Sequence, residues 1–205
     1  MPKARIISIL FLLASTACSD TADTTPGPEP AGQGETPTVA PSGAVASRAP
    51  RCGINDGTLL SGDGLGQLRV GAALGDVRAH CTVLRDTTMP GAEGMPERRI
   101  GVDLTSDTVE AIVVNDSVWR IHVDGSSFRT TEGLGVGSTV AELRQGRAAR
   151  VLAGEGSMFV TLADHCGLSF RLSGVPFGPE RPAAELPADG RVVEVLAFGC
   201  DSPQP

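Results

Sequence analysis

Apolar and polar residues alternate along much of the chain between residues 100 and 198. Ile100, Val102 and Leu104 alternate with Gly101 and Asp103. Because side chains in a strand point alternately to opposite faces, this spacing predicts a strand with one buried face. The same pattern predicts further strands at 109–114, 118–123, 149–153, 158–162, 168–172 and 191–198.

Turn signals separate these predicted strands. Asn115 and Asp116 lie between the strands at 109–114 and 118–123. Both residue types tolerate the positive φ of a two-residue hairpin turn, so we expect a β-hairpin here. A Pro-rich insertion between the last two predicted strands is too long for an ordinary hairpin loop.

A short internal similarity occurs at an offset of 66 residues. The identical residues are Leu68, Val70, Gly71 and Arg78, which recur as Leu134, Val136, Gly137 and Arg144. Thr139 and Glu142 have the spacing of a capping box, which predicts that a helix begins there. The first copy has Ala73 at the capping position, and alanine cannot cap, so we expect the helix near Leu74 to His80 to be shorter or frayed.

Each predicted helix is followed by three or four predicted strands. We therefore expect an α+β fold with two tandem repeats of a short helix followed by antiparallel strands, forming one sheet with the helices on one face. Residues 51–205 would form this single domain, with halves of about 51–130 and 131–205.

This arrangement, with the two segments 71–78 and 137–144, resembles the half-repeats of beta-lactamase-inhibitor proteins and of BamE-type outer-membrane lipoproteins. The resemblance implies a protein that binds other proteins without catalysis. The shared segment is a helix entrance, so the resemblance assigns no functional residue.

The first residues have the pattern of an export signal. Lys3 and Arg5 precede an apolar run at 6–13, which suits a signal peptide and is too short to span a bilayer. Small residues lead to Cys18 and resemble the lipobox of bacterial lipoproteins. We expect residues 1–17 to be the signal peptide and Cys18 to carry lipid; cleavage by an ordinary signal peptidase after Ala17 is the alternative.

Residues 18–50 are expected to be a disordered tether behind the lipidated cysteine. Eighteen of the 32 residues from 19 to 50 are Pro, Gly, Ser or Thr, so little apolar surface offsets the entropy of ordering. Ser19, in place of Asp, resembles the sorting signal for the outer membrane. We therefore expect the protein in the cell envelope, facing the periplasm or the surface.

Four cysteines remain when Cys18 is lipidated. Cys52, Cys81, Cys166 and Cys200 allow three pairings, and the layout in two halves favours one bridge within each half, Cys52 with Cys81 and Cys166 with Cys200. Each would close a loop of about thirty residues. The pairs His80-Cys81 and His165-Cys166 leave a zinc site as an alternative, although neighbouring strand residues point to opposite faces.

Composition excludes several classes of function. Lys3 is the only lysine, so the phosphate-binding loop that ends in Gly-Lys-Ser/Thr cannot occur. The formal charge of -7 disfavours a nucleic-acid partner. The chain contains no Gly-x-Ser-x-Gly elbow and no His-Glu-x-x-His pair, and we expect neither enzymatic activity nor a cofactor nor a bound metal.

Two regions are candidate binding sites. If one sheet face packs on the helices, alternation places a mixed-charge set on the other, which would suit an extended partner or a plain solvated surface. That set is Arg99, Asp103, Glu110, Arg120, His122, Ser169, Arg171 and Glu194. Phe177 and Leu186 in the Pro-rich insertion form a candidate binding loop, unless they pack back on the core.

The sequence thus predicts an extracytoplasmic lipoprotein that acts as a non-enzymatic protein-binding or envelope-assembly module. Its partners would be membrane lipid, through the anchor, and an envelope protein. One alternative is an enzyme inhibitor that inserts the loop at 175–187 into a target. Another is a small-ligand sensor or hydrolase using His122 or His165 with Arg120.

Overall fold

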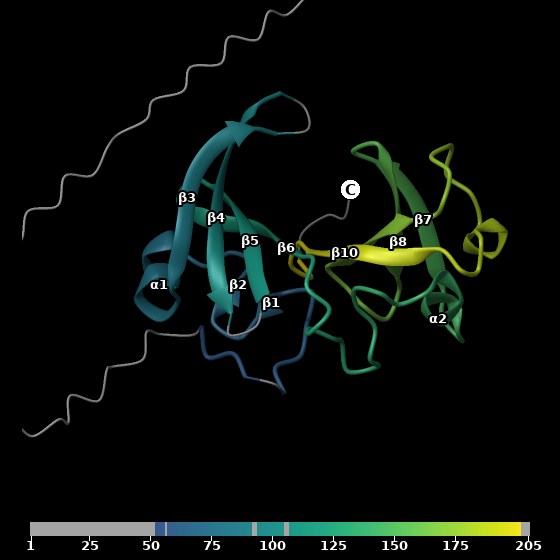
Figure 1. Ribbon diagram of the computed structural model, residues 1–205, viewed down its shortest axis with the longest axis horizontal. Helices are drawn as coiled ribbons and strands as arrows, with labels where there is room; N and C mark the ends of the chain where they lie inside the picture. Colours follow the sequence, from purple (N-terminus) through teal and green to yellow (C-terminus); the bar gives the residue numbers. More distant parts are fainter. Residues whose placement is uncertain (1–51, 56, 92–93, 105–106, 202–205) are drawn as a thin grey trace, which may run out of the picture. The chain divides into compact units, whose positions relative to one another are not determined.

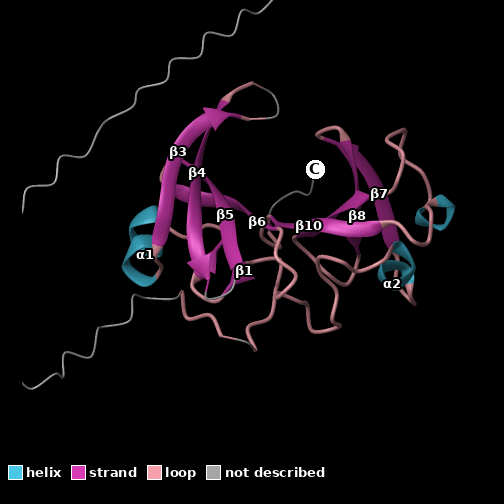
Figure 2. Cartoon of the chain, in the orientation of Figure 1, coloured by secondary structure: helices cyan, strands magenta, loops and turns pink. Residues whose placement is uncertain are grey.

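The fold is mostly β: one eight-stranded antiparallel sheet with two short helices (Figures 1 and 2). The computed structural model describes residues 52–55, 57–91, 94–104 and 107–201. The helices are α1 (Leu74–His80) and α2 (Val140–Arg144), and a 3-10 turn, η1, covers Ala183–Glu185. The predicted α+β class therefore assigned too much helix to this fold. The predicted leader, Cys18 and the tether lie outside the described residues.

The sheet consists of two four-stranded meanders that join at one seam. The first is β3 (Val83–Pro90), β4 (Pro96–Leu104), β5 (Asp107–Val114) and β6 (Ser117–Val123). The second is β7 (Ala149–Gly154), β8 (Ser157–Leu162), β9 (Leu168–Ser173) and β10 (Arg191–Ala197). The strand order β3-β4-β5-β6-β10-β9-β8-β7 leaves β3 and β7 at the edges and β6 paired with β10 in the middle (Figure 1). A separate ribbon joins β1 (Gly64–Leu65) and β2 (Leu68–Arg69).

One face of the sheet forms the hydrophobic core. A buried row crosses seven strands and consists of Val102, Val109, Val123, Val195, Phe170, Val160 and Val151. Leu74 and Val77 of α1 and Val140 and Leu143 of α2 belong to the same core. The alternation that predicted seven strands is confirmed, and so is the two-residue hairpin, since Asn115 and Asp116 have φ of 50° and 56°. No helix among the described residues is long and apolar enough to cross a membrane.

The two helix entrances are fixed to the sheet by matching backbone hydrogen bonds. The Gly71 N–H donates to the Val118 carbonyl over 2.7 Å, and the Gly137 N–H donates to the Val192 carbonyl over 2.8 Å. Both glycines have positive φ, 83° and 92°, a conformation that strains other residues. Each entrance is therefore held by the first residues of the last strand in its own meander.

The two helix starts differ in their side chains. The capping box is confirmed: the Thr139 hydroxyl accepts from the Glu142 N–H, and the Glu142 carboxylate accepts from the Thr139 N–H. Ala73 provides no such cap, yet α1 has seven residues and α2 has five, so the prediction of a shorter first helix is wrong. The backbone replaces the cap, because the Leu74 N–H donates to the Asp116 carbonyl over 2.8 Å.

Two disulfides join Cys52 to Cys81 and Cys166 to Cys200, the pairing that the layout in two halves favoured. The first links the start of the folded domain to the end of α1, and the second links the β8–β9 turn to the end of β10. Both bridges indicate an extracytoplasmic protein, because disulfides persist in oxidising compartments. Cys81 and Cys166 are therefore not available as thiolate ligands, which removes the His-Cys zinc site.

Candidate binding surface on the second face of the sheet

The sheet face opposite the core carries most of the mixed-charge residues expected from alternation. We call it the second face and define it by Arg99, Glu110, Arg120, His122, Arg171 and Glu194. The register places Arg99 and Arg120 opposite Ile112, Glu110 opposite His122, and Glu194 opposite Arg171. Asp103 is exposed near the end of β4, and Ser169 is buried opposite Leu196.

Ion pairs link the strands of the first meander on this face. Glu110 of β5 accepts from Arg85 of β3 over 2.6 Å and from Arg99 of β4 over 3.1 Å. Arg99 also donates to Glu97 over 2.9 Å. These contacts tie the edge strand to the middle of the sheet through side chains that are partly shielded from water.

Arg120 is the most buried cation of the second face. Its side chain is 6% exposed, and its guanidinium lies 5.0 Å from the ring centre of Trp119. Its Nη1 donates to Glu155 over 2.8 Å, and its Nη2 lies 3.6 Å from Glu97. A positively charged side chain that is buried away from water needs carboxylate partners of this kind. Arg120 is therefore a structural part of the second face.

The contact between Arg120 and Glu155 requires a strongly curved sheet. Arg120 lies on β6, whereas Glu155 lies in the turn between β7 and β8, and β10 and β9 separate these elements in the strand order. At about 4.8 Å per strand, side chains so separated on a flat sheet would not meet. Twist and coiling therefore bring the β7–β8 turn over the second face.

His122 links the two meanders at the seam. Its Nδ1 lies 2.8 Å from Glu194 of β10, and Glu194 also accepts from Arg171 over 3.2 Å. Burial alone would raise the pKa of Glu194, but the hydrogen bond with His122 and the contact with Arg171 hold that pKa below its usual range. Glu194 is therefore a carboxylate, and the Nδ1 of His122 donates to it.

A small apolar cluster lies on the second face and was not expected from the sequence. It consists of Phe159, Leu196 and Phe198, which are buried together away from the main core. Trp119 borders the cluster, is 47% exposed, and packs edge-on against Phe198 with ring centres 6.4 Å apart. The second face is therefore not a plain solvated surface.

The position of Trp119 results from a β-bulge. The register between β5 and β6 shifts so that Val113 faces Val118 while Ile112 faces Arg120, and Trp119 has no opposite residue. Val118 and Ile121 are both buried although three positions separate them. This break in the two-residue period was the sequence signal that could have revealed the bulge.

His165 is a structural residue. It is buried, its Nδ1 lies 2.9 Å from Asp164, and its Nε2 lies 2.7 Å from Glu132. The hydrogen bond with His165 holds the pKa of Asp164 below its usual range. Backbone and Thr130 hydrogen bonds, together with His165, do the same for Glu132. Because both ring nitrogens contact carboxylates, His165 has no free nitrogen to act as a general base.

The two residues of the candidate binding loop are separated. Phe177 is 61% exposed, whereas Leu186 is 4% exposed and belongs to the main core. The η1 turn brings Leu186 inward, and Arg144 of α2 donates to the Ala183 carbonyl over 2.9 Å. Leu186 is therefore not a surface anchor, and Phe177 alone remains available for contact.

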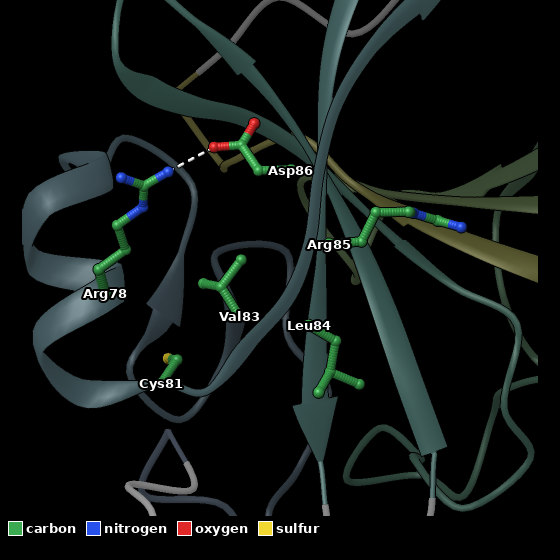
Figure 3. A pocket seen from close by; sticks show the side chains of 6 residues that line it. All are labelled: Arg78, Cys81, Val83, Leu84, Arg85 and Asp86. Carbon is green, nitrogen blue, oxygen red and sulfur yellow. Dashed lines mark hydrogen bonds and ion pairs between the residues drawn. The ribbon is translucent and has the colours of Figure 1, made fainter.

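An open depression lies beside α1 and β3 (Figure 3). Arg78, Cys81, Val83, Leu84, Arg85 and Asp86 line it. Figure 3 shows Arg78 directed at Asp86, with which it forms an ion pair, while Arg85 points to the other side of β3. The charged side chains that line this depression are thus already in ion pairs. The described residues contain no group of three or more His, Cys, Asp or Glu side chains that could hold a metal.

No family model and no curated protein matches this sequence. Among solved structures, the chain is similar to the crystal structure of the uncharacterized protein YfeY from Escherichia coli, with 19% identity and a TM-score of 0.52. The match covers 69% of this chain and 100% of that chain. At this identity the likeness concerns the fold alone, which YfeY and this chain share.

Proposed function

We propose that this protein is a membrane-anchored envelope lipoprotein and that its folded domain is a non-enzymatic binding or assembly module which docks a partner protein through the second face. The observation that carries this proposal is Trp119, which is half exposed beside a buried apolar cluster and an Arg-Glu network. Tryptophan and arginine are the residues most often found at energetic centres of interfaces.

The anchor follows from the leader and the small residues before Cys18. Ser19 favours the outer membrane over the inner one. The 32 residues between Cys18 and Arg51 would let the domain reach partners close to the membrane. The two disulfides agree with an extracytoplasmic location.

Binding is favoured over catalysis by the surroundings of His165 and His122. Both ring nitrogens of His165 contact carboxylates, and the Nε2 of His122, which has no partner, is buried away from solvent. A general base would need a free nitrogen in reach of a substrate.

We also propose that the two halves are tandem repeats. Matching hydrogen bonds at Gly71 and Gly137 support this idea. So does the element order, in which a helix precedes four antiparallel strands in each half.

Site-specific photo-crosslinking in the native envelope tests the docking surface. A photoreactive residue at Trp119 is compared with one at Phe177, the other exposed aromatic residue in the part of the chain that the structure describes. We expect a discrete crosslinked species from position 119 and none from position 177. The reverse result would favour the inhibitor alternative, in which the loop at 175–187 enters a target.

The anchor is tested separately by the substitution Cys18→Ala. We expect the variant to leave the membrane fraction or to retain its leader, whereas the unsubstituted chain stays with the membrane after a high-salt wash. A Cys18→Ala variant that fractionates with the membrane in processed form would contradict lipid anchoring.

A further inference from the structure

Two buried guanidinium N–H groups on the second face have no hydrogen-bond acceptor. They are Nε of Arg99 and Nε of Arg120, and the buried Nε2 of His122 is also without a partner. Arg99 and Arg120 lie opposite Ile112 on either side of β5, about 10 Å apart, and His122 follows Arg120 by two residues on the same face. An unpaired buried donor costs about 1–3 kcal/mol. The face therefore holds more donor capacity than its own carboxylates use.

The guanidinium of Arg120 is only partly paired with carboxylates. A guanidinium is suited to grip a carboxylate with two nitrogens at once. Glu155 contacts only Nη1, Glu97 lies near Nη2, and Nε has no partner. One edge of this buried guanidinium is thus not matched by any carboxylate among the described residues.

Glu155 is placed so that another carboxylate could displace it from the Arg120 guanidinium. It lies in the two-residue turn between β7 and β8 with a φ of 47°, and its side chain is 41% exposed. A left-handed glutamate costs about 1–2 kcal/mol relative to a residue that accepts this conformation. The Glu155 carboxylate reaches Arg120 from an exposed turn, so it can leave without disturbing the core.

We propose that Arg120 receives an acidic side chain from an extended peptide of the partner protein, that this carboxylate replaces Glu155, and that a neighbouring apolar side chain of the peptide packs on Trp119. This inference rests on the proposed role of the second face as the docking surface. The chain carries a net charge of -7, but salt screens such charges beyond about 8 Å at physiological ionic strength. Within that distance the arginines lie beside Glu97, Glu110, Glu155 and Glu194, so the peptide carboxylate is attracted where it takes the place of Glu155 at Arg120.

The chain supplies its own reporter for this binding. Trp119 is the only tryptophan and the chain has no tyrosine, so its intrinsic fluorescence reports on this face alone. The full chain in detergent is titrated with acetyl-Phe-Glu-Phe-amide and with the matched peptide acetyl-Phe-Gln-Phe-amide. We expect a saturable change in fluorescence and at least about tenfold tighter binding of the Glu peptide, which corresponds to about 1.4 kcal/mol.

Two variants assign the effect to the proposed residues. Arg120→Gln should bind the Glu and Gln peptides equally. Because loss of a buried arginine can prevent folding, Glu155→Gln provides a second test: removal of the built-in competitor should tighten binding of the Glu peptide about threefold to tenfold. Glu180→Gln, which changes an exposed carboxylate in the Pro-rich insertion, should leave binding unchanged.

The outcomes separate this inference from the proposed function. Equal binding of the Glu and Gln peptides, or no gain in Glu155→Gln, would overturn the carboxylate site, whereas a Trp119 crosslink would still support docking. A response to N-acetylphenylalanine but not to the blocked Glu peptide would overturn the peptide as the source of the carboxylate. Peptide discrimination without any crosslink at position 119 would instead overturn docking of a partner protein.

Discussion

The two halves of the sheet use the same backbone scheme but different side chains to fix it. In both, a glycine with positive φ donates to the last strand of the following meander. The first half has an uncapped helix whose end is closed by the Cys52–Cys81 bridge. The second has a capped helix and a bridge placed at the β8–β9 turn. The two halves thus share the backbone hydrogen bonds that define the architecture. Only the second helix has a side-chain cap, and the disulfide that stabilises each half lies at a different position in the two.

The largest effect is expected from the disulfides. The bridges span 29 and 34 residues, and loop-closure entropy assigns each about 3–4 kcal/mol of the free energy of unfolding. Cys52→Ala/Cys81→Ala and Cys166→Ala/Cys200→Ala should therefore destabilise the domain about equally in urea denaturation. If one pair proved several-fold more costly, native contacts rather than loop closure would dominate the difference.

The two histidines that contact carboxylates should differ next. His165→Ala removes a ring that contacts Asp164 and Glu132 and packs against Phe170, so we expect the free energy of unfolding to fall by about 2 kcal/mol. His122→Ala loses one carboxylate contact and should cost about 1 kcal/mol. Equal losses in thermal or urea unfolding would contradict a greater structural role for His165.

The helix starts offer a matched pair of smaller effects. Thr139→Ala should lower the free energy of unfolding by about 1 kcal/mol, because it removes the side-chain acceptor of the Glu142 N–H. Ala73→Thr places a cap before Asp76 and should raise stability by about 0.5 kcal/mol. Urea denaturation measures both changes. A destabilising Ala73→Thr would show that the Leu74–Asp116 contact leaves no room for a cap.

The pH dependence of stability that arises in the second half should be the smallest effect. Contacts in the second half hold the pKa values of Glu132 and Asp164 below their usual range. The stability from these carboxylates is present above their unfolded pKa, near 4, and is lost as the pH falls through the lower folded values. Urea midpoints should therefore fall between about pH 5 and pH 2. His165→Gln should flatten that fall, and an unchanged slope would exclude His165 as a cause.

Residues whose burial follows a local period were predictable. The strands at 100–104, 109–114 and 168–172 alternate because one of their faces is buried. The edge strand β3 was missed, because all of its residues after Val83 are exposed and no apolar period marks it. The Pro-rich insertion likewise gave no sign that Leu186 enters the core while Phe177 stays exposed.

The binding surface was predictable only in part. Alternation gave Arg99, Arg120, His122 and Arg171, since each is followed in its strand by a buried apolar residue. It did not give Trp119, because the β-bulge decides on which face of the sheet this side chain lies. It did not give Glu155 either, because this residue contacts Arg120 from the other meander. These contacts arise from register and curvature, which a local pattern does not encode.

The sequence by itself determined seven of the eight strands of the sheet, the helix capping box and the cysteines that the layout in two halves favoured as bridges, because each depends on residue type and spacing. The tertiary structure alone decided that β6 pairs with β10, that the sheet curves until Glu155 meets Arg120, and that two arginine donors on the second face remain without acceptors. These features join residues that are far apart in the sequence. Their contacts form only when all strands of the sheet have paired in the correct register.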